Sequence, residues 1–176
     1  MTTVVGTYVR RLGGALALNP AAYEDVETDG GATTQAFVTV LLSSVAAGIG
    51  AGRSASVVTV AAVALLGWAS WALLTFEVGA RILPGARTHA DVGELLRTIG
   101  FAAAPGLFLV LGVIPGAAGP VFVIVSLWML AAMIVAVRQA LDYASTARAV
   151  AVCATGWALA LAMVLGVGFF AGVRVT

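Results

Sequence analysis

Five long apolar stretches, separated by short polar segments, constrain the fold of this chain more than any other feature. They cover residues 36–52, 56–80, 99–114, 121–137 and 149–173. A bilayer core about 30 Å thick is crossed by a helix of roughly 17–25 apolar residues, and the stretches are of about this length. Only 10% of the chain is charged, whereas a soluble domain carries about a quarter. We therefore predict an all-α fold, a polytopic membrane helix bundle with five transmembrane helices within residues 35–176.

The third and fourth stretches are short, and the segment that joins them begins at Pro115 and ends at Pro120. This segment contains two prolines and two glycines. It cannot continue a helix, which predicts a tight turn between an antiparallel pair. A re-entrant hairpin is the alternative for this pair. Pro105, inside the third stretch, is expected to kink its helix and to free a carbonyl that neighbouring groups must satisfy.

The arginines are distributed unevenly between the two sides of such a bundle. With five crossings, Arg53 and Arg174 fall on one side. The other seven share the opposite side: Arg10, Arg11, Arg81, Arg87, Arg97, Arg138 and Arg148. Cytoplasmic segments of membrane proteins carry the excess of Arg and Lys, so we expect the N-terminus in the cytoplasm and the C-terminus outside. A lysine-free chain rich in Arg, Ala, Val and Gly suggests a GC-rich prokaryote and hence the plasma membrane.

Residues 1–34 are expected to form a cytoplasmic amphipathic segment. Its apolar residues recur at helical spacing: Val4, Val5, Tyr8, Val9, Leu12 and Leu16. Thr7, Arg10 and Arg11 are expected on the opposite face, with the arginines near anionic headgroups. Packing of this helix against the cytoplasmic end of the bundle is the alternative. Asn19 and Pro20 predict the start of a second short helix, and an acidic cluster follows at residues 24–29.

Polar residues at the cytoplasmic ends of the stretches are the candidate functional cluster. Its members are Glu77, Arg81, His89, Asp91, Arg97, Arg138 and Asp142. Glu77 and Arg81 are four residues apart, so they can pair on one helix face, and so can Arg138 and Asp142. Glu77 could instead contact an arginine of a neighbouring helix or lie on an ion path. Thr88 and Asp91 resemble an N-terminal helix cap, and His89 could bind a metal or act as a proton switch.

Several classes of function are excluded by what the sequence lacks. A net charge of +1 argues against nucleic-acid binding, which needs a concentrated basic surface. One Cys and one His exclude a disulfide framework and a Cys/His metal cluster. The sequence has no His-Glu-x-x-His or Gly-x-Ser-x-Gly motif, and without lysine it has no phosphate-binding loop. We therefore expect no catalytic residues, no metal and no cofactor.

The stretches from the third to the fifth resemble the Yip family of integral membrane proteins, in its prokaryotic branch. The resemblance is carried by the run from Leu95 to Pro105, its continuation to Gly116, and Leu127-Trp128. The exit at Val137–Leu141 and the entry at Ser145–Arg148 are similar too. This resemblance implies a five-helix bundle with a cytosolic N-terminal segment. Eukaryotic members are associated with Rab-type GTPases, but the chain lacks their Asp-Leu-Tyr-Gly-Pro-type motif, so a GTPase partner is not carried over.

These features favour a non-enzymatic membrane scaffold or adaptor whose cytoplasmic loops contact a protein partner. A small oligomeric channel or transporter, with Glu77 and the Pro105 kink lining its path, is the alternative. A lipid-handling protein is a third possibility, because a broken third helix could open a lateral groove. The expected partners are membrane lipids, a protein at the cytoplasmic loops, and further copies of the chain.

Overall fold

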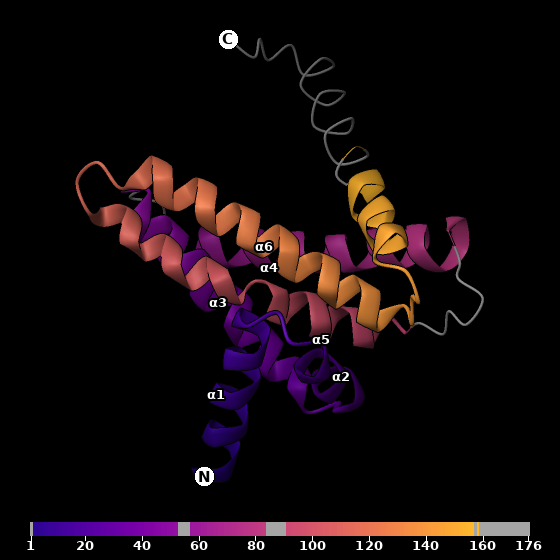
Figure 1. The fold of residues 1–176 in the computed structure, drawn as a ribbon. Coiled ribbons are helices and arrows are strands. Elements are labelled where there is room, and N and C mark those ends of the chain that lie inside the picture. Colours follow the sequence, from indigo (N-terminus) through magenta and orange to yellow (C-terminus); the bar gives the residue numbers. More distant parts are fainter. Residues whose placement is uncertain (1, 53–56, 84–90, 157, 159–176) are drawn as a thin grey trace.

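The computed structural model describes residues 2–52, 57–83, 91–156 and 158, and this part of the chain is helical without strands (Figure 1). Its elements are α1 (Thr2–Leu16), α2 (Pro20–Thr28), α3 (Ala32–Gly50), α4 (Val57–Phe76), the π-helix η1 (Glu77–Ile82), α5 (Val92–Ala102), the 3-10 helix η2 (Ala104–Val113) and α6 (Ala118–Ala140). Within the described residues, three helical segments are long and apolar enough to cross a membrane: α3, α5 with η2, and α6. The prediction of an all-α membrane protein is confirmed at this level.

Small residues let α3 pack closely along α5 and η2. A Cβ on Gly100 would overlap the Cβ of Ala36, and a Cβ on Gly50, at the other end of α3, would overlap the carbonyl of Leu109. Close backbone approach of this kind is how helices associate in lipid, where apolar burial gives no driving force between them. The pairs also fix the direction of packing, because α3 and the α5–η2 segment run side by side from the same end. α6 returns antiparallel to them (Figure 1).

The third predicted stretch, residues 99–114, is the second half of a longer segment. α5 begins at Val92, and η2 continues the helical path to Val113. The break lies at Ala103, two residues before Pro105, near the place where the sequence predicted a kink, because proline removes a helical hydrogen bond. On α3, the Ser43 hydroxyl donates to the carbonyl of Ala103 over 2.7 Å. A side chain of α3 thus adds a second hydrogen bond to a carbonyl beside the break, which also accepts from the N–H of Gly106.

The turn between the third and fourth stretches is shorter than predicted. It occupies residues 114–117, where Gly116 has a φ of +80°. α6 already begins at Ala118 and extends to Ala140, whereas the sequence predicted 121–137. Pro120 therefore lies in the first turn of the helix and not in the connecting turn. A proline is tolerated there because the N–H groups of a first turn have no intrahelical partner.

The second stretch, predicted as one helix over 56–80, divides into α4 and η1. The π-helical turn is held by Tyr143, which lies after α6. Its hydroxyl is 2.8 Å from the carbonyl oxygens of both Gly79 and Leu83. Of the fifth stretch, predicted over 149–173, the structure describes a helix from 146 to 156. The rest of that stretch, except residue 158, lies outside the described residues, as do Arg53, Arg87, Thr88, His89 and Arg174.

The N-terminal segment forms two helices that pack on one side of the bundle. α2 begins at Pro20 and is capped by the Asn19 side chain, which accepts from the N–H of Ala21, as predicted. Tyr23 and Val26 of α2 are buried. α1 runs across the direction of α6 and projects from the bundle (Figure 1). α3 already begins at Ala32, so the predicted boundary between residues 34 and 35 falls inside its first turn.

Candidate functional site

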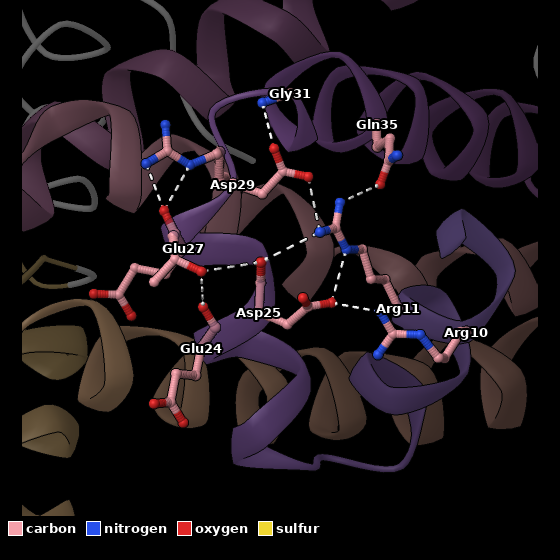
Figure 2. Close-up of polar contacts among 10 residues, drawn as sticks. Arg10, Arg11, Glu24, Asp25, Glu27, Asp29, Gly31 and Gln35 are labelled. Carbon is pink, nitrogen blue, oxygen red and sulfur yellow. Dashed lines mark hydrogen bonds and ion pairs between the residues drawn. The ribbon is translucent and has the colours of Figure 1, made fainter. Parts of the chain in front are cut away.

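Arg11 is the centre of a polar cluster that joins α1, α2 and the start of α3. Figure 2 shows its guanidinium between two carboxylates and an amide. The Nε donates to Asp25 over 2.9 Å, one terminal nitrogen pairs with Asp29 over 2.8 Å, and the other donates to Gln35 over 3.1 Å. Arg10 adds a bond to the same Asp25 oxygen over 2.9 Å. We call these five residues the Arg11 cluster.

The cluster forms because the connection between α1 and α2 brings the two helices into contact. A Cβ on Gly14 would overlap the Cβ of Ala22, so glycine permits their close approach. The Arg11 side chain is only 4% exposed. The planar guanidinium suits this position because it can serve several acceptors at once without being neutralised. The hydrogen bond from Arg11 is the main cause that lowers the pKa of Asp25 and of Asp29.

The sequence placed Arg11 wrongly, on the polar face opposite the apolar side chains. Arg11 is instead buried, while Val4, Val5 and Val9 are exposed. The reason is that Arg11 follows Tyr8 by three positions on the helix, and Tyr8 faces the bundle. The Tyr8 ring meets Phe101 edge-on, with centroids 6.1 Å apart, and its hydroxyl is 3.1 Å from Thr39 Oγ1. The surface next to Tyr8 is acidic, so the arginine can be buried with its charge compensated.

Arg97, a predicted site residue, joins α5 to α2. Its Nε and a terminal nitrogen donate to the carbonyl oxygen of Glu27 over 3.0 and 2.6 Å. Glu27 is near the C-terminus of α2, where carbonyl groups lack intrahelical partners, so the arginine caps this helix end. Burial is the main cause that raises the pKa of the Glu27 carboxyl to about 7, and the nearby carboxylates Glu94, Asp142 and Glu24 contribute to this rise.

Asp91 has a structural task at the start of α5. Its side chain accepts from the N–H of Gly93 over 3.2 Å, and the Glu94 carboxylate accepts from the N–H of Asp91 over 3.0 Å. This reciprocal arrangement is a capping box. The N-cap is therefore Asp91 itself, whereas the sequence suggested a cap in which Thr88 precedes it by three positions.

Glu77 and Arg81 form the ion pair that the sequence offered as one interpretation. Their side chains approach to 2.9 Å and are 49% and 69% exposed. They lie on η1, and π-helical turns are frequent at functional sites. An exposed pair of this kind contributes little to the free energy of unfolding, about 0–1 kcal/mol. Because both side chains are exposed, both remain accessible to a partner.

Arg138 and Asp142 are not brought together as the four-residue spacing suggested. α6 ends at Ala140, and Asp142 follows in a left-handed conformation with a φ of +49°. The Arg138 Nε instead donates to the carbonyl of Tyr143 over 3.3 Å. The Arg148 guanidinium lies over the Tyr143 ring, 5.7 Å from its centroid. Tyr143 thus links the C-terminal end of α6, η1 and the helix that begins at residue 146.

Sequence reasoning missed the Arg11 cluster and Tyr143. For the cluster there was a signal: two arginines, an Asn-Pro helix start and an acidic run predict a helical hairpin whose charges face each other. For Tyr143 there was none. Among the described residues, no three His, Cys, Asp or Glu side chains are arranged to hold a metal ion. The cluster can orient helices and present charge.

The chain was compared with families, curated proteins and solved structures. None of the family models, curated proteins or solved structures matches it. The resemblance to the Yip family therefore stays a prediction from the sequence.

Proposed function

We propose that this chain is a five-span plasma-membrane protein of the Yip type, with its N-terminus in the cytoplasm and its C-terminus outside. The uneven distribution of the arginines supports this orientation. Two polar contacts described above support it as well, since Arg97 of α5 binds the C-terminal end of α2 and Arg138 lies in the last turn of α6, both toward the end of the bundle where α5 begins and α6 ends. Such an end is the one expected to face the cytoplasm.

Within that topology, we infer a non-enzymatic scaffold or adaptor that binds a cytoplasmic protein. The observation that carries this proposal is an exposed surface on α4 and η1. Leu73, Glu77 and Arg81 recur at four-residue spacing, and Ile82 adjoins them. Leu73 and Ile82 are 51% and 64% exposed. We call these four residues the η1 surface. This surface combines two exposed apolar side chains with a charged pair. Protein contacts have such a composition, with apolar groups at the centre and charged groups at the rim.

Photocrosslinking in native membranes tests the proposal. A photoreactive residue at Ile82 is expected to capture one protein reproducibly, and Glu77→Arg is expected to abolish that product through like-charge repulsion with Arg81. The matched control is a photoreactive residue at Val123, which is equally apolar and 55% exposed on α6 and should yield lipid adducts. A scaffold role is refuted if Ile82 gives the same products as Val123.

Topology has its own test. Cysteines at Glu24 and Ala118, each exposed on its helix, are introduced after Cys153→Ala, which removes the one native thiol. An impermeant maleimide added to intact cells is expected to label Ala118→Cys and to spare Glu24→Cys. The reverse pattern would overturn the orientation.

Transport is the competing function. Glu77 is half-exposed and paired with Arg81, which favours a surface role for it over a place on an ion path. Liposome flux that falls on Glu77→Gln would nevertheless establish the channel or transporter alternative. No flux is expected from a scaffold.

A further inference from the structure

We propose that α1 is an interfacial arm, whose valine-bearing face lies in the headgroup and upper acyl region of the inner leaflet and marks where the bilayer ends along the bundle. This inference rests on the membrane-spanning function proposed above. It adds the position of the bilayer along the bundle and identifies the parts of the bundle that lie in water. It also names the phospholipid surface as the ligand of α1.

The first observation is that the apolar stripe of α1 is exposed in the N-terminal half of the helix. Val5 and Val9 are 63% and 59% exposed. Val5 and Val9 lie on one stripe, because they are four residues apart on the helix. The stripe continues into Leu12 and Leu16, which pack against the core where α1 meets the bundle. Exposed apolar side chains along one stripe of a helix at a membrane indicate a contact with lipid or with a protein.

The second observation is that the orientation of this face is fixed. Arg11 lies on a different side of α1 and is bound by Asp25 and Asp29. The cluster therefore turns one side of α1 toward α2 and leaves Val5 and Val9 on another side, exposed beyond the point where Leu12 and Leu16 meet the core. At its other end, α1 is held by the Trp128 indole, which donates to the Leu16 carbonyl over 3.0 Å. α1 is thus a braced arm and not a loose N-terminus.

The third observation is the level at which α1 crosses the bundle. Tyr8 contacts Phe101 at the end of α5, so α1 passes the junction of α5 and η2. Beyond this level, the ten residues of η2 extend about 20 Å at the 3-10 rise. On the near side, the eleven residues of α5 extend about 16 Å at the α rise.

The two sides of that level differ in what they expose. On the outer side, α6 exposes Phe122, Val123, Ile124 and Leu127, each by more than half. On the inner side, α6 presents buried residues, and α2 with its carboxylates lies alongside. If the outer part lies in lipid and α2 lies in water, the exposed apolar residues and the carboxylates are each in a favourable environment. A span of about 20 Å is shorter than the usual core of about 30 Å, a mismatch that bilayers accommodate by local thinning.

We expect α1 to bind the bilayer through apolar contact more than through the charge of its arginines. The Arg11 charge is compensated within the cluster, and Arg10 is bound to Asp25. The sequence expected these arginines to lie among anionic headgroups, and their engagement with Asp25 and Asp29 leaves them little available for that contact. We therefore expect α1 to insert equally into zwitterionic and anionic bilayers. A second copy of the chain is the other occupant that the face could accept, and the test below separates the two.

The experiment uses the full chain with Cys153→Ala in phosphatidylcholine vesicles, with and without phosphatidylglycerol. Single spin labels are placed at Val5 and Val9, at Val123 as the lipid control, and at Glu24 as the water control. Collision with oxygen and with a water-soluble nickel chelate is measured at each site. The oxygen-to-nickel ratio at Val5 and Val9 is expected to lie several-fold above that at Glu24, to approach that at Val123, and to be the same in both lipids.

Nickel accessibility at Val5 and Val9 equal to that at Glu24 would overturn the proposal. So would dipolar broadening at Val5 or Val9 that disappears on dilution with unlabelled chain, because it would assign the face to a second copy. A Val123 label without lipid contact would instead refute membrane insertion itself, which separates failure of the proposed function from failure of the α1 proposal.

Discussion

Replacing Arg11 by Met removes the side chain on which three helices converge, while it keeps a similar apolar stem. The substitution deletes two ion pairs and the bond to Gln35. Removing one member of a fully buried ion pair costs about 3–5 kcal/mol. Here Asp25 and Asp29 are 35% and 46% exposed, so water partly replaces the lost contacts. We therefore expect α1 and α2 to lose about 2 kcal/mol of docking free energy, which is roughly a 30-fold increase in their opening equilibrium.

Hydrogen exchange followed by mass spectrometry in lipid nanodiscs measures this opening, peptide by peptide. The α1 and α2 amides should exchange faster by about that factor, while those of α6 stay unchanged. Arg10→Met is the matched control. It removes one bond to Asp25 from a side chain that is 64% exposed, so its effect should stay below about 1 kcal/mol. Equal acceleration by the two variants would refute the reasoning that burial gives Arg11 its weight.

Three further outcomes follow from the contacts. The pKa of Glu27 is raised from its ordinary value of 4.5 to about 7, mainly by burial, so the docked helix binds this proton more tightly than the free one. The rate-corrected protection of α2 should be greatest near pH 4.5 and fall as pH rises through 7, and Glu27→Gln should abolish that decline. Gly50→Ala places a Cβ on the Leu109 carbonyl and should lower Tm by the equivalent of about 1–3 kcal/mol, whereas Gly48→Ala meets nothing within 4 Å and should not. Tyr143→Phe should weaken η1 by about 1 kcal/mol, seen as faster tryptic cleavage after Arg81.

Much of the helical framework was predictable, because the length of an apolar run and the chemistry of proline are local properties. α3 and α6 coincide with predicted stretches to within a few residues at each end. The differences arise where a residue is compatible with both a turn and a helix start. Pro120 is such a residue, since a proline ends the preceding helix and also fits the first turn of the next.

What could not be predicted depends on contacts between distant segments. The burial of Arg11 follows from the direction in which Tyr8 packs, and Tyr8 packs on Phe101, far along the chain. The π-helical end of the second stretch depends similarly on Tyr143, whose hydroxyl reaches back to Gly79. Periodicity gives the faces of a helix. It does not say which face a partner will cover when an arginine borders an apolar stripe.

Arg11 has two separable roles, which Arg11→Lys distinguishes. During insertion, a positive charge on the N-terminal segment favours its retention in the cytoplasm, and either side chain supplies that charge. In the folded chain, Arg11 serves Asp25, Asp29 and Gln35 from three nitrogens of one rigid plane. A lysine ammonium is a compact point charge and cannot span these partners.

We therefore expect Arg11→Lys to leave maleimide labelling at Ala118→Cys unchanged, while it accelerates exchange in α1 about tenfold, equivalent to about 1.4 kcal/mol. Arg10→Lys, at an exposed position with one partner, is the control and should change neither. If Arg11→Lys retained full protection of α1, charge alone would hold the cluster, and the planar geometry of the guanidinium would not be needed to bury it.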